Sequence, residues 1–242
     1  MKQVAIVTGG SQGIGLAISQ LFINEGYRVY NLDILKSNTG EFIYCDMSNF
    51  ADVIAAINQV IDKEGQIDTL ICNAGVHLSG SIEETSEAQF DQLFAINVKG
   101  AYAAIQASLA TMKQQQSAAI VIISSDQAII GKNNSFAYNL SKHALASICK
   151  TTALDYASFN IRVNAICPGT IETPLYHKAI DKYCAQSGAN KEDIHKEEQA
   201  LQPLGRLGQP DEVAQFALFL AGDKARFITG SLHSIDGGYT TA

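Results

Sequence analysis

The sequence has few of the residues that build metal centres, disulfide frameworks or flexible linkers. It contains five cysteines, five histidines and only four prolines. The cysteine count is odd, no two cysteines stand at metal-ligand spacing, and no H-x-x-x-H pair occurs, so we expect buried reduced thiols and no metal site. No Ser/Gly-rich linker or internal repeat divides the chain, and its 242 residues predict a single domain spanning 1–242.

Clustered positive charge and long apolar runs are also lacking. Lysine and arginine number 17 against 24 aspartate and glutamate, a net charge of −7, which disfavours nucleic acid and anionic membranes as partners. No apolar run approaches the ~20 residues of a membrane span, and the chain enters an apolar segment at Val4 without the pattern of a signal peptide. We expect a cytoplasmic protein that acts on a small-molecule substrate.

Short apolar runs alternate with longer amphipathic segments along the whole chain. The runs are rich in Val and Ile and apolar at consecutive positions, as in strands that are covered on both faces of a parallel sheet. They are Val4–Val7, Val29–Leu32, Phe42–Tyr44, Thr69–Cys72, Ala119–Ile123, Arg162–Ile166 and Ser231–Ile235. The segments with helical periodicity are Ile14–Glu25, Phe50–Glu64, Phe90–Lys113, Ala137–Ser158 and Asp211–Leu220. This alternation predicts an α/β fold with a Rossmann-like doubly wound parallel sheet flanked by helices.

Two stretches depart from the alternation. The link from Asp33 to Phe42 is too short for a full crossover helix. The polar stretch from Glu172 to Leu204 is long, and long insertions in compact domains are commonly lids or binding loops. We therefore predict a substrate lid at 172–204, with a passive surface excursion as the alternative.

A glycine-rich segment, Thr8–Gly15, lies between the first strand and the first helix. Glycines allow the backbone to approach a pyrophosphate, and the helix N-terminus supplies free N–H groups and the positive end of the helix dipole. The spacing G-x-x-x-G-x-G differs from the usual G-x-G-x-x-G, so the prediction depends on position between strand and helix. The predicted phosphate-binding residues are Gly9, Ser11, Gln12, Gly13, Ile14 and Gly15.

Asp33, at the end of the second strand, bears on the choice of cofactor. A carboxylate there accepts the ribose hydroxyls of an adenosine and repels a 2′-phosphate. Neither the glycine segment nor Ile34 offers a positive charge to such a phosphate. The sequence thus favours NAD (NADH) over NADP, although Asp33 could also merely cap a loop.

Tyr138 and Lys142 stand four residues apart in a helical segment and project from one face. Tyrosine has an ordinary pKa of about 10, and a neighbouring ammonium together with the positive nicotinamide is expected to bring that pKa toward neutrality, as a general base requires. Ser125 follows an apolar strand and can hydrogen-bond a substrate oxygen whose charge changes during reaction. Tyrosine and lysine at this spacing also commonly just decorate a helix surface.

The whole chain resembles the short-chain dehydrogenase/reductase superfamily. The motifs that carry the resemblance are Thr8–Gly15, Cys72-Asn73-Ala74-Gly75, Asn97-Val98-Lys99-Gly100, Ser125, Tyr138-x-x-x-Lys142, Pro168-Gly169 and Asp236-Gly237-Gly238. The resemblance implies a seven-stranded parallel sheet, a homotetramer, and reversible hydride transfer between a secondary alcohol or ketone and a nicotinamide cofactor.

The resemblance also implies roles for individual residues. Tyr138 corresponds to the catalytic acid/base, Lys142 to its partner on the nicotinamide ribose, Ser125 to the residue that holds the substrate oxygen, and Asn97 to the support of a proton-relay water. The remaining cofactor-binding positions are Asp46, Met47, Asn73, Ala74, Gly75, Pro168, Gly169, Ile171 and Thr173. For assembly, small apolar residues in Phe90–Lys113 and Ala137–Ser158 permit close helix packing, either between subunits or within one.

The substrate is the least determined feature. The candidate contact residues are His77, Gln127, Lys132 and His177, and these positions are more polar than a fatty or steroid pocket needs. They favour a small polar alcohol, cyclic or carboxylate-bearing, and the loops are similar to those of family members acting on cyclic diols and hydroxy acids. The leading alternative is 3-oxoacyl-[acyl-carrier-protein] reductase, whose basic residues near the ribose and basic carrier patch are not evident. A non-catalytic NAD-sensing protein is a distant alternative, because such proteins usually lose the catalytic tyrosine or lysine.

Overall fold

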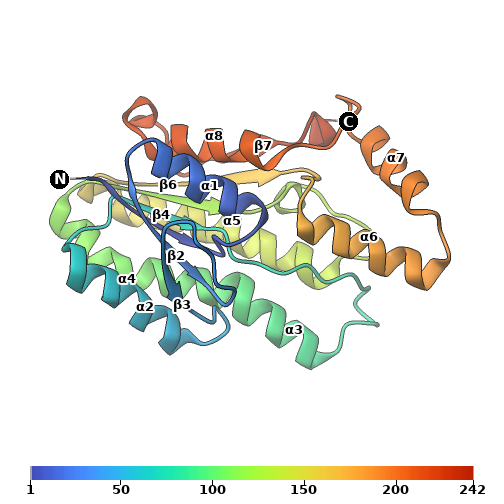
Figure 1. The fold of residues 1–242 in the computed structure, drawn as a ribbon, viewed down its shortest axis with the longest axis horizontal. Coiled ribbons are helices and arrows are strands. Elements are labelled where there is room, and N and C mark those ends of the chain that lie inside the picture. The colour runs from blue at the N-terminus through green and yellow to red at the C-terminus, as the bar shows by residue number, and fades with distance from the viewer. Residues whose placement is uncertain (1, 242) are drawn as a thin grey trace.

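A computed structural model describes residues 2–241, and its centre is one seven-stranded sheet in which every strand pair is parallel (Figure 1). The strands are β1 Val4–Thr8, β2 Arg28–Asp33, β3 Glu41–Tyr44, β4 Thr69–Cys72, β5 Ala118–Ile123, β6 Ile161–Pro168 and β7 Leu232–Ile235. Their order across the sheet is β3-β2-β1-β4-β5-β6-β7. Each predicted strand is present within a few residues of its expected bounds, and the doubly wound α/β fold is confirmed.

Helices cover both faces of this sheet. They are α1 Gly13–Asn24, α2 Phe50–Glu64, α3 Glu87–Phe94, α4 Gly100–Gln115, α5 Phe136–Tyr156, α6 Pro174–Ser187, α7 Lys191–Leu201 and α8 Pro210–Ala221. Figure 1 shows α1 and α8 on one side of the sheet and α2, α4 and α5 on the other. Val4 and Ile6 of β1 belong to the core with α2, α4 and α5, whereas Ala5 and Val7 belong to the core with α1 and α8. Successive side chains on a strand point to opposite faces, which is why the runs are apolar at every position.

The segment predicted as one helix over Phe90–Lys113 is interrupted. Helix α3 ends at Phe94, a π-helical turn covers Ala95–Lys99, and α4 begins at Gly100. The wider turn contains Asn97, whose side chain is bonded to Val76 on a different part of the chain. Hydrophobic periodicity cannot reveal such a turn, because its cause is a tertiary contact; π-helical turns are frequent at functional sites.

The two irregular stretches behave differently. Residues 34–40 contain no helix, and β3 pairs directly beside β2, as the short link predicts. Residues 172–204 form α6 and α7, capped at their N-termini by the side chains of Thr173 and Asn190. These helices extend from one end of the molecule (Figure 1) and share a small apolar cluster of their own, centred on Tyr176, Ile180 and Leu207.

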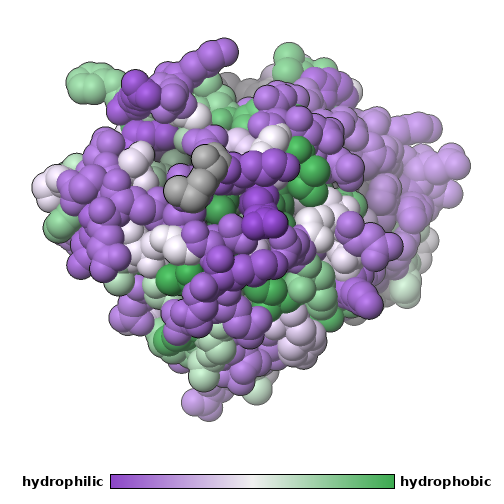
Figure 2. Space-filling view, turned by 60° about the vertical axis from the view of Figure 1, so that its left-hand side comes forward, coloured by the Kyte–Doolittle hydropathy of each residue, from purple (hydrophilic) through white to green (hydrophobic). Residues whose placement is uncertain are grey.

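All five cysteines are free thiols, and four of them are buried. Within residues 2–241, no group of three His, Cys, Asp or Glu side chains is placed to hold a metal ion. No helix in the described part of the chain is both long and apolar enough to cross a membrane. Figure 2, which brings forward the end of the molecule opposite α6 and α7, shows a mostly hydrophilic face with small scattered hydrophobic spots.

We expect Arg162→Met to lower the free energy of unfolding by about 2–3 kcal/mol. The Arg162 guanidinium on β6 donates to the carbonyls of Leu220, Ala221 and Gly222 at the end of α8, at 2.7, 3.0 and 3.2 Å. A cation at a helix C-terminus satisfies these carbonyls and complements the helix dipole. Chemical denaturation measures the loss.

The matched control is Arg226→Met. Among residues 2–241, Arg226 pairs only with Asp223, and both side chains are strongly exposed, so this change is expected to alter stability by less than about 0.5 kcal/mol. Equal losses in the two variants would contradict the role given to Arg162.

Candidate active site

The candidate site is a cleft of about 560 Å³ at the carboxyl ends of the strands. The chain passes from β1 outward to β2 and β3, then returns to the other side of β1 as β4. Ligands of doubly wound sheets bind at such a reversal of strand order. The cleft is lined by the segments that follow β1 to β6 and by α6.

The glycine segment forms one wall of this cleft and fits a pyrophosphate. A Cβ atom on Gly15 would lie 2.1 Å from the carbonyl oxygen of Gly9, and one on Gly9, whose φ is +67°, would lie 2.9 Å from Cα of Ala74. Only glycine permits this packing. The first turn of α1 has no acidic residue, and the N-cap Gln12 gives it no side-chain hydrogen bond. Its N–H groups therefore remain available to an anion.

Asp33 is held rigidly beside the glycine segment. Its Oδ2 accepts the backbone N–H of Ser11 at 3.0 Å, and its Oδ1 accepts that of Leu35 at 2.9 Å. Ser11 Oγ donates to the Leu35 carbonyl at 2.6 Å, so Ser11 ties the loop to β2 and does not line the cleft. Asp33 caps this loop and also lines the cleft, so its contacts within the loop leave it available to a ligand.

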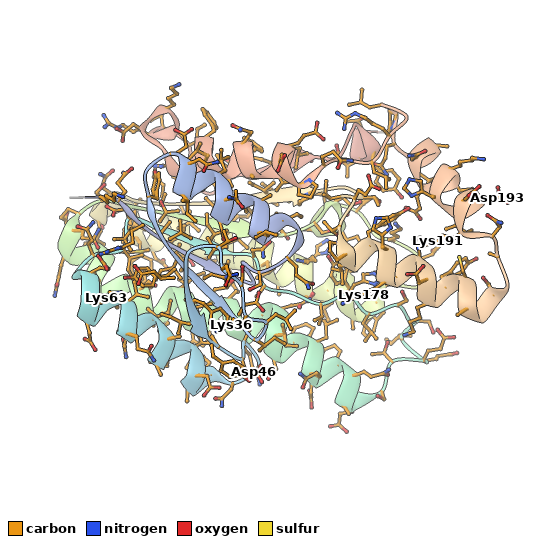
Figure 3. All side chains as sticks on the ribbon, viewed as in Figure 1. Lys36, Asp46, Lys63, Lys178, Lys191 and Asp193 are labelled. Atoms are coloured by element: carbon orange, nitrogen blue, oxygen red, sulfur yellow. The ribbon has the colours of Figure 1, made fainter. Side chains whose placement is uncertain are left out.

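The opposite wall comes from a distant part of the chain. Pro168, Gly169, Ile171 and Thr173 follow β6 and line the cleft. A Cβ atom on Gly13 would lie 3.3 Å from Cγ2 of Thr173, so the start of α6 meets the glycine segment. Asp46, labelled in Figure 3, and Met47 line the cleft after β3, and Asn73, Ala74 and Gly75 line it after β4.

Ser125, Tyr138 and Lys142 lie together in the cleft. Lys142 is only 5% exposed, its Nζ donates to the Ile123 carbonyl at 3.2 Å, and Nζ lies 5.3 Å from the Tyr138 ring centroid. Ser124 Oγ donates to the Lys142 carbonyl at 3.1 Å, which fixes α5 against the end of β5. The four-residue spacing thus places both side chains of α5 beside the serine.

Burial is the leading influence on the protonation of Tyr138 and Lys142. Burial lowers the pKa of Lys142 to about 8. Burial also raises the pKa of Tyr138, and a hydrogen bond with Ser125 opposes that rise. Among the protein's own groups, the ammonium bonds to Ile123, and the cost of desolvating a phenolate dominates the tyrosine pKa. The lowering of that pKa by Lys142 and the nicotinamide together stays a prediction. Strongly perturbed titratable groups in a cleft are typical of functional sites.

Asn97 is close to this group but does not line the cleft. It is 1% exposed; its Oδ1 accepts from Val76 N at 2.8 Å, and its Nδ2 donates to the Val76 carbonyl at 3.0 Å and to Ser141 Oγ at 3.2 Å. The side chain therefore joins the segment after β4 to α5, one residue before Lys142.

Of the residues predicted to contact substrate, three line the cleft and one does not. His77, Gln127 and Lys132 line it, and the His77 ring meets the Tyr138 ring edge-on with centroids 4.7 Å apart. His177 lies in a separate hollow between α6 and α7, 3.6 Å from Glu172 Oε1. The next residue of α6, Lys178, which is labelled in Figure 3, lines the cleft instead, so a contact between His177 and the substrate stays a prediction.

Asp126 belongs to the polar loop before Tyr138 from which the sequence suggested substrate contacts, but it was not among the four residues predicted to make them. It is 6% exposed and lines the cleft. Its Oδ1 accepts from Ser125 Oγ at 2.6 Å and from Gln127 N at 2.8 Å. Its position directly after Ser125 was the available signal.

Comparison with known proteins places the chain among dehydrogenases and reductases. Residues 9–240 match the family model described as Enoyl-(Acyl carrier protein) reductase. Cyclopentanol dehydrogenase of Comamonas sp. is 33% identical, over 98% of this chain and 97% of that protein. A short-chain dehydrogenase family protein from Francisella tularensis aligns with a TM-score of 0.93 and 37% identity over 100% of both chains.

Two further solved structures bear on ligands. Aldohexose dehydrogenase of Thermoplasma acidophilum, in ligand-free form, aligns with a TM-score of 0.95 and 38% identity, over 100% of this chain and 95% of that one. ElxO with NADP bound aligns with a TM-score of 0.90 and 31% identity over 100% of both chains.

Replacing the buried Lys142 by an apolar residue is expected to stabilise the fold. With a folded pKa of about 8 against an ordinary value of about 10.4, charged Lys142 costs about 1–3 kcal/mol at pH 7. Lys142→Met should therefore be more stable than the unaltered protein at pH 7. Between about pH 8 and 10, Lys142 is protonated in the unfolded chain but not in the folded protein. The unaltered protein therefore becomes more stable as the pH rises through this range, and the difference in free energy of unfolding between it and Lys142→Met narrows.

Urea denaturation of both proteins at pH 7 and pH 9.5 measures this difference. Subtracting one free energy of unfolding from the other at each pH cancels the contribution of groups that titrate in both proteins. A Lys142→Met protein that is less stable than the unaltered protein at both pH values would contradict the cost assigned to burying the ammonium.

Proposed function

The chain belongs to the short-chain dehydrogenase/reductase superfamily, and we propose that it catalyses reversible NAD(H)-dependent hydride transfer between a secondary alcohol and a ketone, with Tyr138 as acid/base. That it is an oxidoreductase acting on CH–OH groups follows from its relatives. The observation that carries the finer proposal is the convergence of Ser125, Tyr138 and Lys142 in the same cleft as the glycine segment and Asp33.

The residues present fit a nicotinamide dinucleotide. The glycine segment and the free N–H groups of α1 suit the pyrophosphate, and Asp33 suits the adenosine ribose. Thr173 stands where the second wall meets this loop, and Ile171 lines the same wall. The bound cofactor accepts or supplies the hydride. Tyr138 Oη takes the proton from the substrate hydroxyl during oxidation and returns it to the carbonyl oxygen during reduction. Ser125 holds that oxygen, Lys142 adds positive charge beside the phenol, and Asn97 positions α5.

NAD(H) is favoured over NADP(H) by the surroundings of Asp33. Its carboxylate is fixed by two backbone N–H groups at the edge of the cleft, where it would repel a 2′-phosphate. Ile34 and Leu35 beside it are apolar, and the next residue, Lys36, does not line the cleft. A relative that holds NADP shows that the fold alone does not decide this choice.

A small polar or cyclic alcohol is the proposed substrate class. Asp126, Gln127 and Lys132 line the cleft beside Ser125 and Tyr138, and relatives are named for cyclopentanol and aldohexoses. The family model is described by an acyl-carrier-protein activity, so a 3-oxoacyl thioester remains the alternative. Buried polar groups at the substrate end disfavour it, because an acyl chain would leave them without hydrogen-bond partners.

Three features of the surroundings are proposed with this function. Helices α6 and α7 act as the lid over the cleft, since α6 lines it and the two helices share their own apolar cluster. A homotetramer is supported by the exposed apolar side chains of Tyr102 on α4 and of Leu140 and Leu154 on α5. The cytoplasm suits five free cysteines, because it keeps thiols reduced.

We expect Tyr138→Phe to lower turnover by about 10²- to 10⁴-fold, the usual contribution of general acid–base catalysis. Phenylalanine keeps the ring contact with His77 but removes the proton donor and acceptor. The assay measures NADH oxidation against ketones and NAD⁺ reduction against cyclic alcohols, sugars and 3-hydroxyacyl thioesters. NADH binding, followed by fluorescence, should be nearly unchanged. A variant that keeps most of its activity would remove Tyr138 from its proposed role.

Cofactor choice is tested by Asp33→Ala. The ratio of kcat/KM for NADH to that for NADPH should fall at least about tenfold, or about 1.4 kcal/mol, because the carboxylate that binds the ribose and repels the phosphate is gone. Asp62→Ala, an exposed position on α2, is the control and should leave the ratio unchanged. Equal use of the two cofactors by the unaltered protein would show that Asp33 does not select NAD(H).

A further inference from the structure

Asp126 is a buried carboxylate of which only one oxygen accepts hydrogen bonds from the described part of the protein. Its Oδ1 accepts two hydrogen bonds, from Ser125 Oγ and from Gln127 N. Its Oδ2 has no hydrogen-bond partner among residues 2–241. The buried side-chain atoms that lack a partner in that range are Ser19 Oγ, Asn31 Oδ1 and His233 Nε2. Because Oδ2 is not one of these and Asp126 lines the cleft, this oxygen is open to a ligand.

Two other polar side chains of the cleft, those of Gln127 and Lys132, also carry hydrogen-bond donors without a partner in residues 2–241. Gln127 is 5% exposed, and its Oε1 accepts from Ser135 Oγ at 2.6 Å, so its Nε2 is left without a partner in the described chain. Lys132 lines the same cleft and acts electrostatically on Asp126, yet no carboxylate in residues 2–241 lies within 4.0 Å of its ammonium. Side chains that line this cleft thus carry two donor groups and one acceptor without an internal hydrogen-bond partner in residues 2–241.

Burying such groups costs free energy unless something completes their hydrogen bonds. If Asp126 served only to orient Ser125, one oxygen would suffice, and the second would need no access to the cleft. A fatty or purely apolar substrate would leave Oδ2 desolvated and without a partner. A negatively charged group next to the reacting carbon would be repelled by the carboxylate.

We propose that Asp126 is a substrate-binding residue that accepts a hydrogen bond from a second hydroxyl of the substrate, so that the enzyme acts on vicinal diols and other polyhydroxylated alcohols. Because Ser125 Oγ and Asp126 Oδ1 are 2.6 Å apart, an oxygen held by Ser125 and an oxygen held by Oδ2 are close neighbours. Oxygens on adjacent carbons meet this requirement. The inference rests on the proposed function, since Ser125 must hold the reacting oxygen.

The test compares matched substrates on matched variants. The substrates are cis- and trans-cyclohexane-1,2-diol against cyclohexanol, and propane-1,2-diol and glycerol against propan-2-ol, with NAD⁺ reduction as the readout. The unaltered protein should favour at least one diol over its monohydroxy match by about 10- to 100-fold in kcat/KM, the effect of one hydrogen bond to a charged group. Asp126→Asn retains an oxygen for Ser125 and Gln127 but replaces the second acceptor by an amide donor. It should remove most of the preference for the diol, because kcat/KM for the diol should fall at least about tenfold more than kcat/KM for the monohydroxy alcohol.

Controls distinguish substrate binding by Asp126 from a role in positioning Ser125. Asp62→Asn removes an exposed carboxylate on α2 and should preserve the preference. Equal losses on diol and monohydroxy alcohol in Asp126→Asn would mean that Asp126 only positions Ser125, and would overturn the proposal. So would an unaltered protein that prefers no diol over its match.

Failure of the proposed function is recognised separately. Binding of the same pairs to the Tyr138→Phe protein with saturating NADH is measured by calorimetry, which needs no turnover. Tighter binding of a diol than of its match supports the diol site even if no alcohol reacts, whereas equal binding contradicts it.

Discussion

The parallel direction of all seven strands is the constraint on which the rest of this molecule depends. Parallel strands require a crossover after each strand and bury both faces of the sheet. In β1, for example, alternate side chains pack into two separate hydrophobic cores, one on each face of the sheet. Because every strand ends at the same edge, the segments that follow β1 to β6 are brought into one cleft although they are distributed along the whole chain.

That cleft holds charged side chains that are costly to bury. The Lys142 ammonium and the Asp126 carboxylate are each more than nine-tenths buried and are held from different elements, α5 and the end of β5. Their pKa values move in opposite directions, that of Lys142 downward and that of Asp126 upward, and burial is the leading cause of both shifts. Such a site destabilises the fold, and the large apolar cores on either side of the sheet offset that cost. A hydrophobic replacement would stabilise the protein but leave the cleft without its chemistry.

Much of the site could be predicted because its residues are fixed by local rules. The glycine segment lies between a strand and a helix, Tyr138 and Lys142 are related by helical spacing, and Asp33 ends a strand. The structure brings all of them to the cleft. Other features depend on contacts between distant parts of the chain. The π-helical turn at Asn97 follows from bonds to Val76 and Ser141. The position of His177 in the hollow between α6 and α7 depends on how these two helices pack, and the raised pKa of Tyr138 follows from desolvation.

The sequence by itself determined the fold and the composition of the site. The period of its apolar residues fixed which segments are strands or helices, and the positions of its glycines fixed where backbone can approach a phosphate. Only the tertiary structure decided which atoms are free to act. Whether Asp126 keeps an unused oxygen, or whether Lys142 bonds to Tyr138 or to Ile123, depends on burial and on the partners supplied by other elements. Those quantities exist only once the chain is folded, because desolvation and hydrogen bonding depend on every neighbour of a group, and sequence spacing describes only the nearest ones.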